Sequence, residues 1–174
     1  ADKVGLKRRE ENPGFTGDEE FNFFLAVLFP DEELKILPYN RVVKDLNGLS
    51  KEAFLSKVEE NFELSVSDVP VSPDKKGTYG MFLDNTWYLL KAKGKILSDD
   101  AVDGLDVAVL QNNLLEPVLG IIDPKTDKRI DFVGGIRGLK ELERRCSLDC
   151  VVAFSMYPTS ISELFAVSDN NRLM

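Results

Sequence analysis

Histidine is absent from this sequence of 174 residues, and cysteine and tryptophan are scarce. Without histidine the chain cannot form a Ser-His or Cys-His catalytic pair or a histidine-bound metal site. The two cysteines, Cys146 and Cys150, are too few for a disulfide framework, and zinc needs more ligands than they supply. We therefore expect no metal site, and we expect reduced thiols in a cytoplasmic protein.

Long apolar runs are also missing. The longest, Phe23–Phe29, is far shorter than the roughly 20 residues that a transmembrane helix needs, so no membrane span is expected. The net charge of −8 disfavours binding to DNA or RNA, because polyphosphates are bound by basic surfaces. A hydrophobic content of 43% with 30% charged residues indicates a globular domain, and the length suits one domain over residues 1–174.

Short strand patterns dominate the first half of the chain, and helices intervene later. A hairpin is expected from a buried strand over 21–29 and a second strand over 34–46, which Pro38 places at an edge or bulge. Further strands are predicted over residues 63–69, 78–83, 87–91, 129–133 and 151–156. Those over 78–83 and 87–91 are expected to form a hairpin, because only the short polar turn Asp84-Asn85-Thr86 separates them. Helices are predicted over residues 1–12, from Ser50, over 105–115 and 139–147, and from Ser160. This pattern is typical of an α+β fold: a mixed sheet with β-hairpins and with helices packed on it.

The most apolar strand positions are predicted to share one buried core. We expect that core to contain Phe23, Leu25, Val27, Phe132, Val152 and Phe154.

A glycine-rich turn is the sharpest local pattern. Gly134, Gly135 and Arg137 follow a predicted strand and precede a predicted helix. Backbone N–H groups and the positive end of a helix dipole converge in such a turn, so it can hold an anion. The alternative is a tight turn that needs a positive φ, with Arg137 paired to Glu141 one helical turn along.

Two polar groups are further candidates for anion or ligand binding. The first follows the second predicted strand and contains Arg41, Lys44, Asp45 and Asn47. The second contains Thr159 and Ser160, at the start of the last helix. The alternatives are an exposed strand end with ordinary ion pairs and, for Ser160, simple capping of the helix together with Glu163.

Three segments carry a resemblance to a known family. They are residues 39–46 (YNRVVKDL), 127–138 (DKRIDFVGGIRG) and 153–160 (AFSMYPTS). The chain closely resembles the family called domain of unknown function 1015, over nearly its whole length. The N-terminal half of that family looks like the ParB/sulfiredoxin superfamily, which includes partition proteins and an ADP-dependent kinase that acts on free serine. A role in serine metabolism is implied by association, since family genes often lie beside serine-biosynthesis genes.

The family's Asp-Gly-His-His-Arg motif, expected to act on nucleotide phosphates, does not occur in this sequence. The resemblance therefore implies a C-terminal fragment whose partner is its own N-terminal domain. No cofactor is expected in the fragment, whereas ADP or ATP is expected for the full-length protein, with a small molecule or nucleotide as the ligand.

Three functions are compatible with these observations. The first is an accessory or substrate-covering part of a nucleotide-dependent small-molecule kinase-like protein, with serine as a candidate substrate and with no catalytic activity in the fragment alone. The second is a non-catalytic interaction or dimerisation module. The third is a ParB-like regulatory role with DNA, which the acidic charge opposes.

Overall fold

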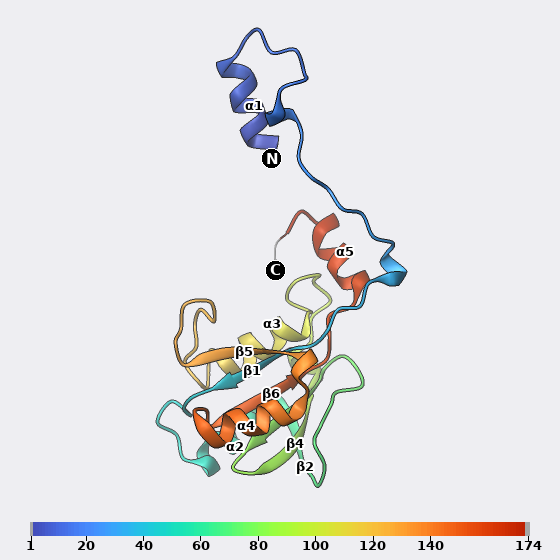
Figure 1. Cartoon of the computed structure of the whole chain (residues 1–174). Helices are drawn as coiled ribbons and strands as arrows, with labels where there is room; N and C mark the ends of the chain where they lie inside the picture. The colour runs from blue at the N-terminus through green and yellow to red at the C-terminus, as the bar shows by residue number, and fades with distance from the viewer. Residues whose placement is uncertain (1, 173–174) are drawn as a thin grey trace. The chain divides into compact units, whose positions relative to one another are not determined.

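The computed structural model describes residues 2–172, and the chain divides into two compact units, Ala1–Leu34 and Lys35–Met174. In the N-terminal unit, helix α1 spans Asp2–Glu11, as the sequence predicts (Figure 1). Two single 3₁₀ turns follow, η1 over Glu20–Asn22 and η2 over Asp31–Glu33. No helix in the described part of the chain is long and apolar enough to span a bilayer.

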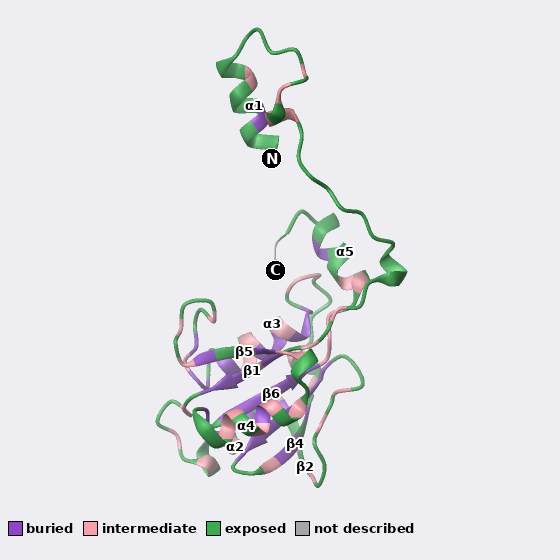
Figure 2. Ribbon diagram, viewed as in Figure 1, coloured by how far each residue is buried: buried purple, intermediate pink, exposed green. Residues whose placement is uncertain are grey.

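The predicted buried strand over residues 21–29 is wrong. Beyond η1 this segment is extended, but it pairs with no strand of the described chain, and Figure 2 shows it as exposed. Phe23, Leu25 and Val27 are 67%, 93% and 66% exposed, so they do not belong to the core. Apolar and β-branched residues favour an extended backbone, but a strand is stable only when a neighbouring strand satisfies its hydrogen bonds. The predicted hairpin between 21–29 and 34–46 is therefore wrong as well.

The second unit is built on six strands, and every pairing between them is antiparallel. The strand order is β2-β4-β3-β6-β1-β5. The strands are β1 Tyr39–Val43, β2 Phe62–Ser67, β3 Thr78–Leu83, β4 Thr86–Ala92, β5 Ile130–Gly134 and β6 Val152–Met156. This sheet with its helices confirms the α+β class, although the sheet is antiparallel rather than mixed. Strand β1 lies between β6 and β5, and Pro38 immediately precedes it, outside the strand.

The predicted β3–β4 hairpin is confirmed. Asp84 and Asn85 have φ angles of 49° and 56°, the left-handed conformation that a two-residue turn between antiparallel strands requires.

Capped helices complete the second unit. Ser50 caps α2, because its hydroxyl accepts a hydrogen bond from the Ala53 N–H. Ser160 and Glu163 form a reciprocal capping box at the start of α5, as predicted. The helices are α2 Lys51–Asn61, α3 Asp106–Leu110, α4 Leu139–Leu148 and α5 Ile161–Asp169, with 3₁₀ turns η3 Gly94–Ile96 and η5 Gly135–Arg137 and a π turn, η4 Gln111–Leu115.

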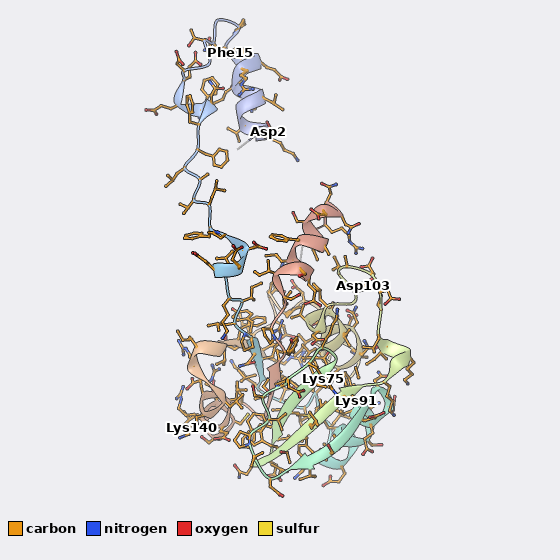
Figure 3. The ribbon with its side chains drawn as sticks, turned by 90° about the vertical axis from the view of Figure 1, so that its right-hand side faces the viewer. Asp2, Phe15, Lys75, Lys91, Asp103 and Lys140 are labelled. Atoms are coloured by element: carbon orange, nitrogen blue, oxygen red, sulfur yellow. The ribbon has the colours of Figure 1, made fainter. Side chains whose placement is uncertain are left out.

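The sheet buries apolar side chains on both faces. Val43 and Phe154 point to the main core, which α2, α3 and η4 cover, whereas Val42 packs with Leu142 of α4 on the opposite face. Figure 1 shows α4 lying across that second face. Val152 and Phe154 are fully buried, as predicted. Phe132 is only half-buried, because it lies on β5 at the edge of the sheet. In Figure 3, Lys91 of β4 and Lys140 of α4 lie at the outer surface of this unit.

Candidate functional site

A cavity of about 490 Å³ lies within the second unit, at the end of the sheet where β5, β1 and β6 run side by side. Tyr39 and Arg41 are two residues apart on β1, so their side chains share a face of the sheet. Arg41 lies opposite Phe132 of β5 in the strand register. The rings of Tyr39 and Phe132 stack in parallel with their centroids 5.0 Å apart. This floor is thus a strand arginine beside two flat aromatic rings.

The remaining walls come from segments far apart in the sequence. Val107 of α3 and Leu164 of α5 contribute apolar side chains, and Thr159 contributes a hydroxyl just before α5. The other lining residues are Ile36, Leu37, Pro124, Lys125, Met156 and Tyr157. Three of the twelve lining residues are polar and not aromatic: Arg41, Lys125 and Thr159. We call this cavity the Arg41 pocket.

Arg41 has an unusual electrostatic environment. Its guanidinium donates a hydrogen bond to the carbonyl of Tyr39, and its central carbon lies 5.4 Å from the centre of the Phe132 ring and 5.9 Å from that of Tyr39. Within residues 2–172, no carboxylate oxygen lies within 4 Å of the guanidinium. Burial lowers the pKa of Arg41 to about 10, so the side chain stays positive at neutral pH. A partly desolvated cation without a carboxylate partner favours an incoming anion.

The pocket is suited to binding and offers little for acid–base chemistry. Its lining residues include no aspartate and no glutamate. Elsewhere in residues 2–172, no three cysteine, aspartate or glutamate side chains gather where they could hold a metal ion. The pocket's own residues can therefore orient and neutralise an anion, but they supply no carboxylate for a magnesium ion or a general base.

The residue before one of the lining residues is a buried aspartate. Asp106 precedes the lining residue Val107 and is only 7% exposed. One of its oxygens accepts hydrogen bonds from the Gly77 N–H at 2.9 Å and the Tyr79 hydroxyl at 3.4 Å, while the other has no partner in the described chain. Burial raises the pKa of the Asp106 carboxyl. Sequence reasoning missed this residue, since it looks like an ordinary acidic residue in the first turn of a helix.

The other residues of the first predicted group lie away from the pocket, beyond the opposite end of β1. The side chain of Lys44 is exposed. Asp45 lies 3.4 Å from Arg129, which is also 2.8 Å from Asp127. These contacts are ordinary ion pairs at an exposed strand end, which is the alternative to a ligand-binding group.

Asn47 has a structural part in the same region. Its φ is 56°, and its side-chain amide donates to the carbonyl of Val118 at 3.3 Å. The structure thus separates Arg41 from Lys44, Asp45 and Asn47.

A close approach and a positive φ account for two glycines of the turn, Gly135 and Gly138. A Cβ added to Gly135 would lie 2.6 Å from the Pro38 ring, and Gly138 has a φ of 71°. The N–H of Gly135 is already used by the Pro38 carbonyl, at 2.7 Å. Arg137 is exposed and lies 3.9 Å from Glu141. None of the described pockets includes Gly134, Gly135 or Arg137, so anion binding at this turn stays a prediction.

Thr159 and Ser160 differ although they are neighbours. Thr159 lines the Arg41 pocket, whereas Ser160 is engaged in the capping box, where its hydroxyl accepts from the Glu163 N–H at 3.1 Å. Glu163 also pairs with Lys76 at 2.6 Å. Of the predicted site residues, the fold therefore brings together Arg41 and Thr159.

Comparison with known proteins gives one match. A profile of the family described as protein of unknown function (DUF1015) matches residues 1–108. Searches of curated proteins and of solved structures returned no match. The matched region holds the N-terminal unit, strands β1 to β4 and the Arg41 side of the pocket, and it covers more than half of the chain. The chain therefore belongs to the DUF1015 family.

Proposed function

We propose that this chain is the accessory, substrate-covering part of a nucleotide-dependent small-molecule kinase-like protein, with serine as the candidate substrate. The observation that carries the proposal is Arg41, a partly desolvated guanidinium in a cavity of about 490 Å³ with no carboxylate partner in the described chain. That volume falls within the range of ordinary small-molecule sites, roughly 300–1,000 Å³. A phosphate or carboxylate would satisfy the remaining N–H groups of the guanidinium.

An accessory role fits the pocket better than a catalytic one. Phosphoryl transfer requires metal-binding side chains and a group that positions the attacking oxygen. The pocket lining has no carboxylate, and the chain has no histidine. We therefore expect that residues 1–174 alone transfer no phosphoryl group from ATP or ADP to serine. A coupled assay that detects robust serine phosphorylation by this chain would contradict the proposal.

Calorimetric titration of the chain with ADP and with ATP tests the binding site. Removal of one charge-assisted hydrogen bond costs about 1.5–3 kcal/mol, so Arg41→Gln is expected to weaken binding by roughly 10- to 150-fold. Arg137→Gln is the matched control: it makes the same chemical change at an exposed arginine already close to Glu141. If Arg137→Gln abolishes nucleotide binding and Arg41→Gln leaves it unchanged, the site is the glycine turn and the Arg41 pocket is the wrong assignment.

A second candidate function, an interaction module, is favoured by the exposed apolar segment Phe23–Phe29. Leu25 and Leu28 are both 93% exposed, and Phe24 is 73% exposed. A patch of this kind usually marks a binding surface. We propose that its partner is the N-terminal domain that the family resemblance implies. Hydrogen exchange should then show the amides of 23–29 protected in a full-length family protein and rapidly exchanging in residues 1–174; equal exchange rates would argue against this partner.

A further inference from the structure

The walls of the Arg41 pocket indicate the shape and polarity of its ligand. Nine of the twelve lining residues are apolar or aromatic. Tyr39 and Phe132 stand parallel on the floor with an interplanar angle of 2°. Apolar walls bind the body of a ligand by removing its surface from water, and flat rings favour flat partners. A small, fully hydrated anion such as inorganic phosphate would leave most of this surface unused.

The charges of the pocket disfavour a free amino acid as its ligand. Arg41 and Lys125 both bring positive charge, and no lining residue is acidic. Glu163 precedes the lining residue Leu164, but its carboxylate is already bound to Lys76 at 2.6 Å and to the Ser160 N–H at 2.9 Å. Asp106, whose second carboxylate oxygen has no partner in the described chain, precedes Val107 but is not itself among the lining residues. The ammonium group of a free amino acid would therefore be desolvated near two cations with no carboxylate in the pocket lining, which is unfavourable.

The guanidinium of Arg41 is preorganised for one anionic group. The Tyr39 carbonyl accepts its one hydrogen bond within the described chain, and the central carbon of the guanidinium lies over the rings of Phe132 and Tyr39, at 5.4 Å and 5.9 Å from their centres. An arginine has five N–H donors, so several remain for a ligand. A side chain that is already ordered loses little further freedom when the ligand binds.

We infer that the Arg41 pocket serves the nucleotide side of the proposed reaction and not the amino-acid side: its ligand is a flat aromatic body that carries a phosphate group. The body lies among the aromatic and apolar walls, and the phosphate lies at Arg41 with Lys125 and Thr159 within the same cavity. This inference rests on the proposed anion site and adds the class of ligand to it. The inference predicts that neither serine nor phosphoserine is the preferred ligand of this pocket.

Four probes that share a phosphate group test this inference. They are adenosine monophosphate, phenyl phosphate, O-phosphoserine and inorganic phosphate, each titrated calorimetrically into the 174-residue chain. The two aromatic probes are expected to bind about tenfold or more tightly than inorganic phosphate, because their rings bury apolar surface. O-phosphoserine is expected to bind no more tightly than inorganic phosphate. Tighter binding of O-phosphoserine than of both aromatic probes would overturn the inference.

Two pairs of variants separate the contribution of the charge from that of the walls. Arg41→Gln is expected to weaken all probes that bind, while Arg137→Gln leaves them unchanged. Leu164→Ala removes part of a wall and is expected to weaken the aromatic probes by about three- to tenfold without affecting inorganic phosphate. Phe165→Ala is the matched control, because this neighbour on α5 is 48% exposed and is not among the lining residues.

The possible failures are distinguishable. If all four probes bind equally and all depend on Arg41, the anion site stands and the ligand class inferred here is wrong. If no probe binds, or if binding does not depend on Arg41, the proposed function itself fails. Circular dichroism and thermal unfolding of each variant show whether a loss of binding reflects a loss of fold.

Discussion

Truncation of Phe154 is the most direct test of where the core lies. Phe154 is fully buried on the central strand β6, opposite Arg41 on one side and Met81 on the other. Removal of a buried phenyl ring costs its transfer free energy plus the free energy of the cavity left behind, about 3–5 kcal/mol for Phe→Ala. For a unit of this size, we expect Phe154→Ala to lower the melting temperature by roughly 10–20 °C.

Urea unfolding followed by tryptophan fluorescence measures this effect. Trp87 is the one tryptophan of the sequence, and it is buried in the second unit, so its emission reports the unfolding of that unit. Phe165→Ala, in the same unit, and Phe24→Ala, in the apolar segment of the first unit, remove exposed rings and should each change the free energy of unfolding by less than about 0.5 kcal/mol. A cost of under 1 kcal/mol for Phe154→Ala, or a comparable cost for Phe24→Ala, would refute this placement of the core.

Two further changes probe the turn and the buried carboxylate. Gly135→Ala is expected to destabilise by about 1–3 kcal/mol, because its Cβ would lie 2.6 Å from Pro38, whereas Gly134→Ala, with no neighbouring atom within 4 Å, should be nearly neutral in the same unfolding assay. Asp106 has a raised pKa, so its favourable contribution to stability is present below its ordinary pKa of 3.8 and is lost as pH rises through the folded pKa. The free energy of unfolding of Asp106→Asn, relative to that of the unmodified chain, should therefore increase as pH rises from 3.8. A difference that stays constant with pH would mean that the pKa of Asp106 is not raised by folding.

Local signals predict much of the second unit correctly. The Ser50 and Ser160 caps and the Asp84-Asn85 turn depend on residues within a few positions of one another. Each of these patterns satisfies backbone groups locally, so the sequence alone is sufficient. Helix starts and the β3–β4 hairpin are confirmed for that reason.

The error over residues 21–29 has a different origin. The apolar composition of this segment is compatible with a buried strand, but burial depends on a partner that local sequence does not specify. The same limit applies to the pairing of β1. Its neighbours are β5 and β6, which lie about ninety or more residues further along the chain, and no short-range pattern reveals such a pairing.

The candidate site could be predicted only in part for the same reason. Arg41 and Thr159 were both candidates, but they belonged to separate groups until the strand register brought them to one cavity. Lys125 and Asp106 were not singled out, because their roles depend on burial and on neighbours from other segments. Conversely, Lys44 lies close to Arg41 in the sequence, but β1 runs away from the pocket after Arg41 and Lys44 follows its far end.

The two arginine candidates differ in what already surrounds them, and this difference favours Arg41 as the anion site. Arg137 is exposed and lies 3.9 Å from Glu141, a carboxylate that Arg144 also binds at 2.7 Å. An anion at Arg137 would compete with that carboxylate and with water, so little free energy would be gained. Arg41 is partly desolvated and has no carboxylate within 4 Å in the described chain. An anion there would replace no existing ion pair and would restore favourable interactions that burial has removed, so the same ligand is expected to bind more strongly at Arg41.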